Sequence, residues 1–226
     1  MTGPRALTFW ERAFVGLLGF VSRRTEGYAV DFAGELVRQY GVRGLLRWGR
    51  QANDSWKRLV NDFGEEDAHL LAAFSSLWNG CLYCAEGHLL AHNLHVFHEG
   101  QRLFPLDEHE LRELARLRDA EILDLLRARL GEAHAKKLAL VLRQHAIKNA
   151  VEEPRTPEPV LDTQLRHAIT LYDWINECSI MTEAKPPPLG PIAKDKALLA
   201  SYRQVRAQNA GALAPAAPAP AVAAAS

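Results

Sequence analysis

The sequence has little of several features that define common protein classes. Its 226 residues include only three cysteines, and 27 basic residues balance 27 acidic ones, so the formal net charge is zero. Three cysteines are too few for a secreted disulfide scaffold. A chain without a basic excess does not look like a nucleic-acid-binding protein, so we expect no nucleic-acid partner. The hydrophobic share of 48% and the charged share of 24% are typical of a globular protein that folds without disulfides.

Long apolar runs are also missing. The longest run near the start, residues 13–21, is nine residues long and is bounded by Arg12 and Arg23, whereas a membrane-spanning helix needs about 20 apolar residues. Glu11 and the lack of a small-residue cleavage site argue against a signal peptide. We therefore expect no membrane partner and a cytoplasmic protein, in which cysteines stay reduced. The apolar spacing in this segment instead predicts one helix face packed on a core, formed by Trp10, Phe14, Leu17, Leu18 and Val21.

The alternating pattern of β-strands is almost absent, and apolar residues at three- to four-residue spacing predict an all-α fold. Gly41, Gly64 and Asn79-Gly80 separate successive helices, and Asp107 with Glu110 forms a capping box that opens another. Helices are predicted over residues 28–40, 45–63, 65–78, 81–99, from 107, and over 120–130, 132–150, 160–181 and 193–208. The chain divides into an N-terminal helical extension (1–64), a helical core (65–181), a proline-rich connector with a short helix (182–209), and a disordered Ala/Pro tail (210–226).

The most informative segment is NGCLYCAEGHLLAHNLHVFHE, which begins at Asn79. The preceding Asn-Gly pair would place Cys81 in the first turn of a helix, where free amide groups and the helix dipole lower a thiol pKa. His88, one turn beyond Cys84, can accept or return a proton. Helical spacing brings five chemically active side chains onto one face, namely Cys81, Cys84, His88, His92 and His95. This pattern indicates a reactive dithiol.

Two other interpretations of the cysteine pair stay open. Buried cysteines often pack as small hydrophobic residues, which is also what we expect of Cys178. Alternatively, Cys81, Cys84, His88 and His92 form an S₂N₂ set typical of a metal site. Four ligands on one straight helix span about 16 Å, which exceeds one zinc shell. Cys84 and His88 could bind a metal together with an outside residue, but all four could not.

The motif resembles that of the AhpD-like, or carboxymuconolactone-decarboxylase-like, alkylhydroperoxidases. The residues that carry the likeness are Asn79, Gly80, Cys81, Tyr83, Cys84 and His88, with residues 106–111 and 171–176 similar to later family segments. The resemblance covers about residues 67–181, which would be an AhpD-like core. It implies an AhpD-like helical bundle, to which this chain adds N-terminal and C-terminal helices.

The resemblance also implies a thiol-dependent peroxidase. Cys84 would attack the peroxide and become a sulfenic acid, Cys81 would resolve it as a disulfide, and His88 would belong to the proton relay. An external dithiol or a lipoyl-bearing protein would reduce the disulfide, and no bound metal or other cofactor would be needed. Related proteins self-associate, so we expect a homo-oligomer.

One position departs from the family pattern. The family's peroxidases have a glutamate twelve residues before the first cysteine, and this chain has His69 there. Glu65 and Glu66, one turn earlier, could reach the same face and stand in for that glutamate. Either the relay is rebuilt around His69, or peroxidase activity is weak or lost. The alternative hypothesis is a non-catalytic or metal-binding helical protein that keeps the AhpD-like fold. We expect Asn176 to be a buried hydrogen-bonding residue.

Overall fold

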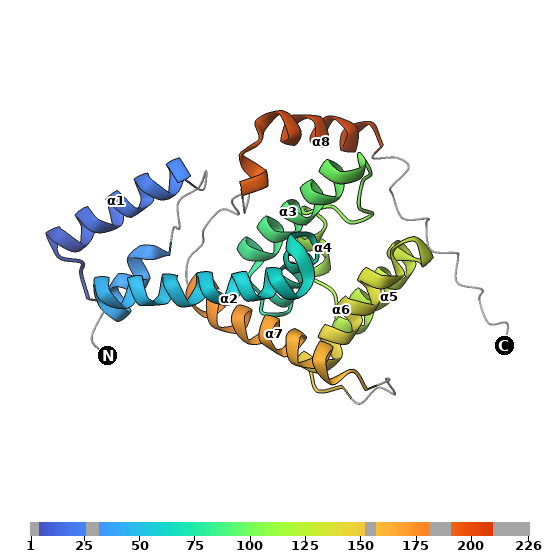
Figure 1. Cartoon of the computed structure of the whole chain (residues 1–226), viewed down its shortest axis with the longest axis horizontal. Helices are drawn as coiled ribbons and strands as arrows, with labels where there is room; N and C mark the ends of the chain where they lie inside the picture. The colour runs from blue at the N-terminus through green and yellow to red at the C-terminus, as the bar shows by residue number, and fades with distance from the viewer. Residues whose placement is uncertain (1–4, 26–31, 152–156, 181–190, 210–226) are drawn as a thin grey trace, which may run out of the picture.

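A computed structural model of the chain describes residues 5–25, 32–151, 157–180 and 191–209 (Figure 1). Within these ranges every regular element is helical, which confirms the all-α prediction. The elements are α1 (Phe9–Thr25), α2 (Ala33–Trp78), α3 (Leu82–Gly100), α4 (Leu111–Leu114), α5 (Asp119–Leu130), α6 (Ala135–Lys148), α7 (Pro159–Ile180) and α8 (Lys196–Gln208), with 3₁₀ turns at Glu132–His134 and Pro191–Lys194. The predicted tail, most of the proline-rich connector and the side chain of Cys178 lie outside the described residues.

Helix α2 consists of three helical pieces in one continuous run. Gly41 (φ 71°, ψ 174°) and Gly64 (φ 78°, ψ 163°) interrupt it with conformations that only glycine adopts without strain. Both are glycines at which the sequence predicts a break between helices. The predicted boundary between residues 64 and 65 therefore falls inside α2, at its second interruption.

Helix α3, which carries the cysteine motif, is the central helix. Fourteen of its 19 residues are buried, because α2 and α7 pack against it and α8 lies along another side (Figure 1). A helix that is buried all round is normally apolar, yet Glu86, His88, His92 and Asn93 lie among its buried residues. Each of these polar groups therefore needs a partner inside the protein.

The C-terminal helix covers α3 through a buried hydrogen-bond network. The Tyr202 hydroxyl donates to Glu108 Oε2 (2.9 Å) and accepts from Asn93 Nδ2 (3.1 Å). Burial, followed by the nearby Glu108 charge, raises the pKa of Tyr202, so the phenol stays protonated and remains a donor. At the predicted capping box, the Asp107 amide donates to Glu110 Oε2 (2.6 Å), but the α-helix that follows is only the four-residue α4.

The N-terminal helix packs differently from the prediction. Phe14 and Leu18 contact the protein, but Trp10 is 78% exposed and Leu17 is 61% exposed. The predicted apolar face was therefore wrong in part, because α1 contacts chiefly α2 and leaves its other side open (Figure 1). No helix in the described part of the chain has the length and apolar character needed to cross a membrane.

Candidate active site

The two cysteines lie at the tight turn between α2 and α3. Gly80 has a positive φ of 75°, which lets the chain reverse so that α3 packs against the last piece of α2. Cys81 is the N-cap residue of α3, and its amide donates to Ser76 O (2.9 Å). Cys84 follows within the first turn of the helix. Both thiols are free and buried, with residue exposures of 2% and 4%.

Ser179 of α7 joins the two thiols. Its Oγ lies 3.0 Å from Cys81 Sγ and 3.4 Å from Cys84 Sγ. The same hydroxyl can donate to Asn176 O, one turn earlier on α7 (3.2 Å). A hydroxyl has a single proton, so Ser179 can donate to one sulfur only by giving up this backbone bond.

The hydrogen bonds of the pair favour a thiolate at Cys81. A hydrogen bond from the Cys84 thiol lowers the pKa of Cys81 most, and bonds from the Ser179 hydroxyl and the Cys84 amide add to it, against the opposing effect of burial. The same bond to Cys81, together with burial, raises the pKa of Cys84. These hydrogen bonds favour the first negative charge of the reduced pair at Cys81, with Cys84 as the S–H donor.

A second cluster links three helices through His88. His88 Nδ1 lies 2.8 Å from His69 Nδ1 on α2, and His88 Nε2 lies 2.8 Å from the Tyr172 hydroxyl on α7. Burial lowers the pKa of His88 to about 3 and lowers that of His69 well below its usual value, so both rings are neutral at neutral pH. One of the facing Nδ1 atoms must then donate and the other accept. Two neutral arrangements satisfy both contacts: either His88 Nδ1 donates to His69 and His88 Nε2 accepts from the Tyr172 hydroxyl, or His69 Nδ1 donates to His88 and His88 Nε2 donates to the Tyr172 oxygen.

Trp56 covers this histidine pair. Its ring centroid lies 4.8 Å from that of His69 and 5.6 Å from that of His88. An indole on one side of the pair keeps bulk water away from it, which is consistent with the lowered histidine pKa values. The predicted neighbours His69 and His88 are thus brought together, although no hydrogen bond joins His88 to either thiol in the described structure.

The two glutamates considered as acids lie farther out. Glu65 Oε2 is 3.5 Å from His95 Nε2, and the His95 ring stacks on that of His69 with centroids 5.8 Å apart. Glu65 thus reaches the histidine pair only through His95. The Glu66 carboxylate instead pairs with Lys137 of α6 and makes no contact with the thiols.

The four residues of the alternative S₂N₂ set, which one straight helix was not expected to bring around a single ion, have other partners. Both nitrogens of His88 are hydrogen-bonded within the protein, and His92 Nδ1 lies against the backbone carbonyl of Glu66. Within the described ranges, the groups whose ligand atoms lie within 4.8 Å of one another are instead Glu66, Asp67 and His92, and Asp107, Glu108 and His109.

The sequence pattern did not indicate Ser179, and Tyr172 entered it only within residues 171–176, one of the segments similar to the family. The signal was present, because Tyr172, Asn176 and Ser179 recur at spacings of four and three and so share one face of α7. All three are buried. Asn176 is the buried hydrogen-bonding residue that was expected, since its Oδ1 accepts from the Ser76 hydroxyl (3.4 Å). A polar stripe on the buried face of a helix is a useful indicator of a site.

Comparisons of the chain with protein-family models, curated protein sequences and solved structures give no match. The chemistry must therefore be inferred from the residues themselves. Two adjacent thiols at a helix N-terminus can lose two electrons and form a disulfide. A neutral histidine pair hydrogen-bonded to a tyrosine can take up or release a proton.

Proposed function

We propose that the chain is a thiol-dependent oxidoreductase that reduces hydrogen peroxide or organic hydroperoxides through Cys81 and Cys84. The observation that best supports this proposal is the hydrogen-bonded thiol pair at the start of α3, with Ser179 in contact with both sulfurs. Stabilising a thiolate in a buried site is what a reactive cysteine requires and a purely structural cysteine does not. The resemblance of the CxxCxxxH segment to AhpD-like peroxidases points to the same chemistry.

The reaction needs only the two thiols, a peroxide and an external dithiol. A thiolate attacks one peroxide oxygen, so an S–O bond forms, the O–O bond breaks, and the leaving oxygen takes a proton to give water or an alcohol. The second thiol then attacks the sulfenic sulfur, which forms the disulfide and releases water. An external dithiol or lipoyl group returns the pair to the thiol state by exchange and is itself oxidised to a disulfide.

The resemblance assigns the attack to Cys84 and the resolving step to Cys81. Because the resting charge is favoured at Cys81, attack by Cys84 first requires its proton to pass along the hydrogen bond to Cys81. His88 lies one helical turn beyond Cys84, a rise of about 6 Å. The Tyr172–His88–His69 cluster begins on this next turn of α3, and the proposal assigns to it the supply of the proton that the leaving oxygen needs.

The proposal extends to the setting of the protein. Free thiols suit a reducing compartment such as the cytoplasm, and a dithiol or lipoyl-bearing protein would be the reducing partner. Large apolar side chains exposed along α1, such as Phe9, Trp10 and Phe20, favour self-association.

The decisive experiment follows both thiols after one equivalent of peroxide. The Cys178→Ser chain serves as the reference, since it leaves Cys81 and Cys84 as the only thiols. It should form the Cys81–Cys84 disulfide, seen by mass spectrometry as the loss of two hydrogens, and should consume peroxide when dihydrolipoamide or dithiothreitol is supplied. In that background Cys84→Ser should abolish turnover, and Cys81→Ser should accumulate a sulfenic acid at Cys84. A reference chain that stays reduced and consumes no peroxide with either donor would favour the non-catalytic alternative.

A further inference from the structure

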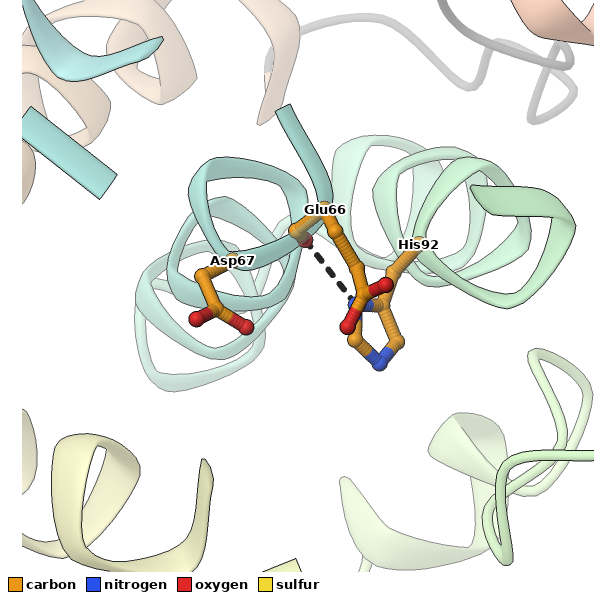
Figure 2. Close-up of side chains that lie close together, drawn as sticks. All are labelled: Glu66, Asp67 and His92. Carbon is orange, nitrogen blue, oxygen red and sulfur yellow. Dashed lines mark hydrogen bonds between the residues drawn. The ribbon is translucent and has the colours of Figure 1, made fainter. Parts of the chain in front are cut away.

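A separate cluster of ligand-type side chains lies where the last piece of α2 begins. Glu66 and Asp67 follow the interruption at Gly64, and His92 faces them from α3. One ligand atom from each residue lies within 4.8 Å of the others. Figure 2 shows the Glu66 carboxylate of α2 beside the His92 ring of α3, and the Asp67 side chain following Glu66 on α2. The proposed dithiol chemistry uses none of these three side chains.

The tautomer of His92 follows from its hydrogen bond. Its Nδ1 lies 2.9 Å from the backbone oxygen of Glu66 (Figure 2). A carbonyl oxygen can only accept, so Nδ1 carries the proton. Burial lowers the pKa of His92 to about 3, so the ring is neutral at neutral pH. The lone pair is therefore on Nε2, which is the atom that binds a metal ion when a carbonyl orients the other nitrogen.

His92 Nε2 lacks a partner of its own. The His92 side chain is fully buried, with 0% exposure. Its Nε2 nevertheless forms no hydrogen bond with any described residue. A buried acceptor without a donor costs free energy, and such groups are rare unless a ligand or an ion completes them. The missing partner of His92 Nε2 is an observation separate from the clustering of the two carboxylates. It indicates that a group able to accept this lone pair, such as a metal ion, can bind here.

The carboxylates already hold a cation. The Lys137 ammonium of α6 pairs with Glu66 and lies 2.6 Å from Asp67 Oδ1. The Glu66 and Asp67 side chains keep 24% and 29% exposure, so this side of the cluster is open to solvent while the imidazole is sealed. The ammonium makes no hydrogen bond to His92 Nε2, whereas a metal ion can bind this nitrogen and the carboxylates together.

We propose that Glu66, Asp67 and His92 form a binding site for a divalent transition-metal ion of the Zn²⁺ or Mn²⁺ type, which replaces the Lys137 ammonium. One imidazole and two carboxylates suit these ions better than Ca²⁺ or Mg²⁺, which prefer oxygen ligands alone. Ligand atoms must come within about 2.0–2.3 Å of the ion. The partly exposed carboxylates can turn inward to reach this distance, while the buried imidazole stays fixed.

The second acidic cluster of the chain provides a matched control. Asp107, Glu108 and His109 also bring their ligand atoms together, but Glu108 accepts from Tyr202 and Asp107 accepts from Arg206. The His109 side chain is 78% exposed. This cluster offers no buried orphaned atom, so we expect it to bind no ion with comparable affinity.

The test uses the untagged chain with all three cysteines changed to serine, which removes thiol ligands. After metal is stripped with a chelator, titration calorimetry with Zn²⁺ and Mn²⁺ should show one bound ion per chain, and Co²⁺ should give a visible absorption spectrum without a thiolate band. His92→Asn, whose amide can still donate to Glu66 O, should lose binding by about tenfold or more. Lys137→Met should bind about tenfold more tightly, because the ion no longer displaces an ammonium. His109→Ala should bind like the parent chain.

Three other results would each contradict the proposed metal site. Absence of binding in the thiol-free chain, with its helical circular dichroism retained, would leave the cluster as an ion pair of Lys137 alone. Equal affinity of the His92→Asn and parent chains would exclude Nε2 as a ligand, and unchanged or weaker binding by Lys137→Met would exclude the exchange of cations. None of these measurements depends on peroxide turnover, so they test the metal site separately from the proposed peroxidase function.

Discussion

Removal of the Ser179 hydroxyl should raise the pKa of the Cys81 thiol. In Ser179→Ala the Oγ that lies 3.0 Å from Cys81 Sγ is lost, and the change leaves only a small void. A hydrogen bond to a charged group is worth about 1.5–3 kcal/mol, and about 1.4 kcal/mol corresponds to one pKa unit. The hydroxyl must give up its bond to Asn176 O when it donates to sulfur, which reduces the net gain. We therefore expect the pKa of Cys81 to rise by about one unit.

The higher pKa expected for the Cys81 thiol in Ser179→Ala can be measured from the pH dependence of its alkylation rate. Iodoacetamide reacts with thiolates, so the alkylation rate follows the thiolate fraction at each thiol. Both cysteines are buried, which slows the reaction at every pH but leaves the titration midpoint readable. Peptide fragmentation in a mass spectrometer assigns the label to Cys81 or Cys84. In the unmodified chain Cys81 should be labelled at the lower pH, and Ser179→Ala should move its midpoint upward.

Ser75→Ala is the matched control. Ser75 is also a fully buried serine, but its hydroxyl accepts from Gln144 Nε2 (2.8 Å) rather than contacting a thiol. The midpoint of Cys81 should stay unchanged in this variant. An unchanged midpoint in Ser179→Ala, or preferential labelling of Cys84 at low pH, would refute the assignment of the thiolate to Cys81.

Two further predictions concern stability. Because His88 and His92 have pKa values of about 3 in the folded chain and about 6.5 when unfolded, protons bind preferentially to the unfolded state as the pH falls through this window. Urea denaturation should therefore show that the free energy of unfolding falls between pH 7 and pH 4. In His92→Asn this fall should be smaller. An equally steep fall in His92→Asn would contradict the role of His92. Gly64→Ala places a side chain at φ 78° and ψ 163° with no heavy atom within 4 Å, so it should cost about 1–3 kcal/mol through backbone strain alone. Gly49→Ala, in a regular and open helical position of α2, should instead be neutral or stabilising in the same assay, and equal effects of the two changes would contradict the assigned strain.

Local features of the fold could be predicted because they depend on neighbours in the chain. Gly41 and Gly64 interrupt α2 where glycine separates two apolar periodicities. Cys81 is the N-cap residue of α3 because Gly80 allows the reversal before it. His69 and His88 could also be expected to approach one another. They lie on consecutive helices on either side of that reversal, so residues at similar distances from the turn lie opposite each other.

Other features depend on which helices pack together, and periodicity does not contain that information. Ser179 meets the cysteines across more than 90 positions of sequence, so only the packing of α7 against the start of α3 identifies it. For the same reason the spacing of α1 correctly predicted a helix but not its buried face. Phe14 is packed and Trp10 exposed, although both fit the same apolar pattern.

The apolar cover over the thiols has a kinetic consequence. Cys81 and Cys84 pack in one cluster with Phe32 and Leu36 at the start of α2, against which α1 lies. A bulky reagent or a partner protein can reach the sulfurs only when this cover opens locally, whereas a smaller molecule needs less opening. The rate at which a bulky disulfide reagent reacts with these cysteines can be compared with its rate of reaction with an unprotected thiol. Each tenfold reduction in rate then corresponds to about 1.4 kcal/mol of free energy for local opening. The reactivity of the cysteine pair thus reports the local stability of the N-terminal region that covers it. The ratio of the modification rates by small and by bulky reagents indicates how far this apolar cover must open.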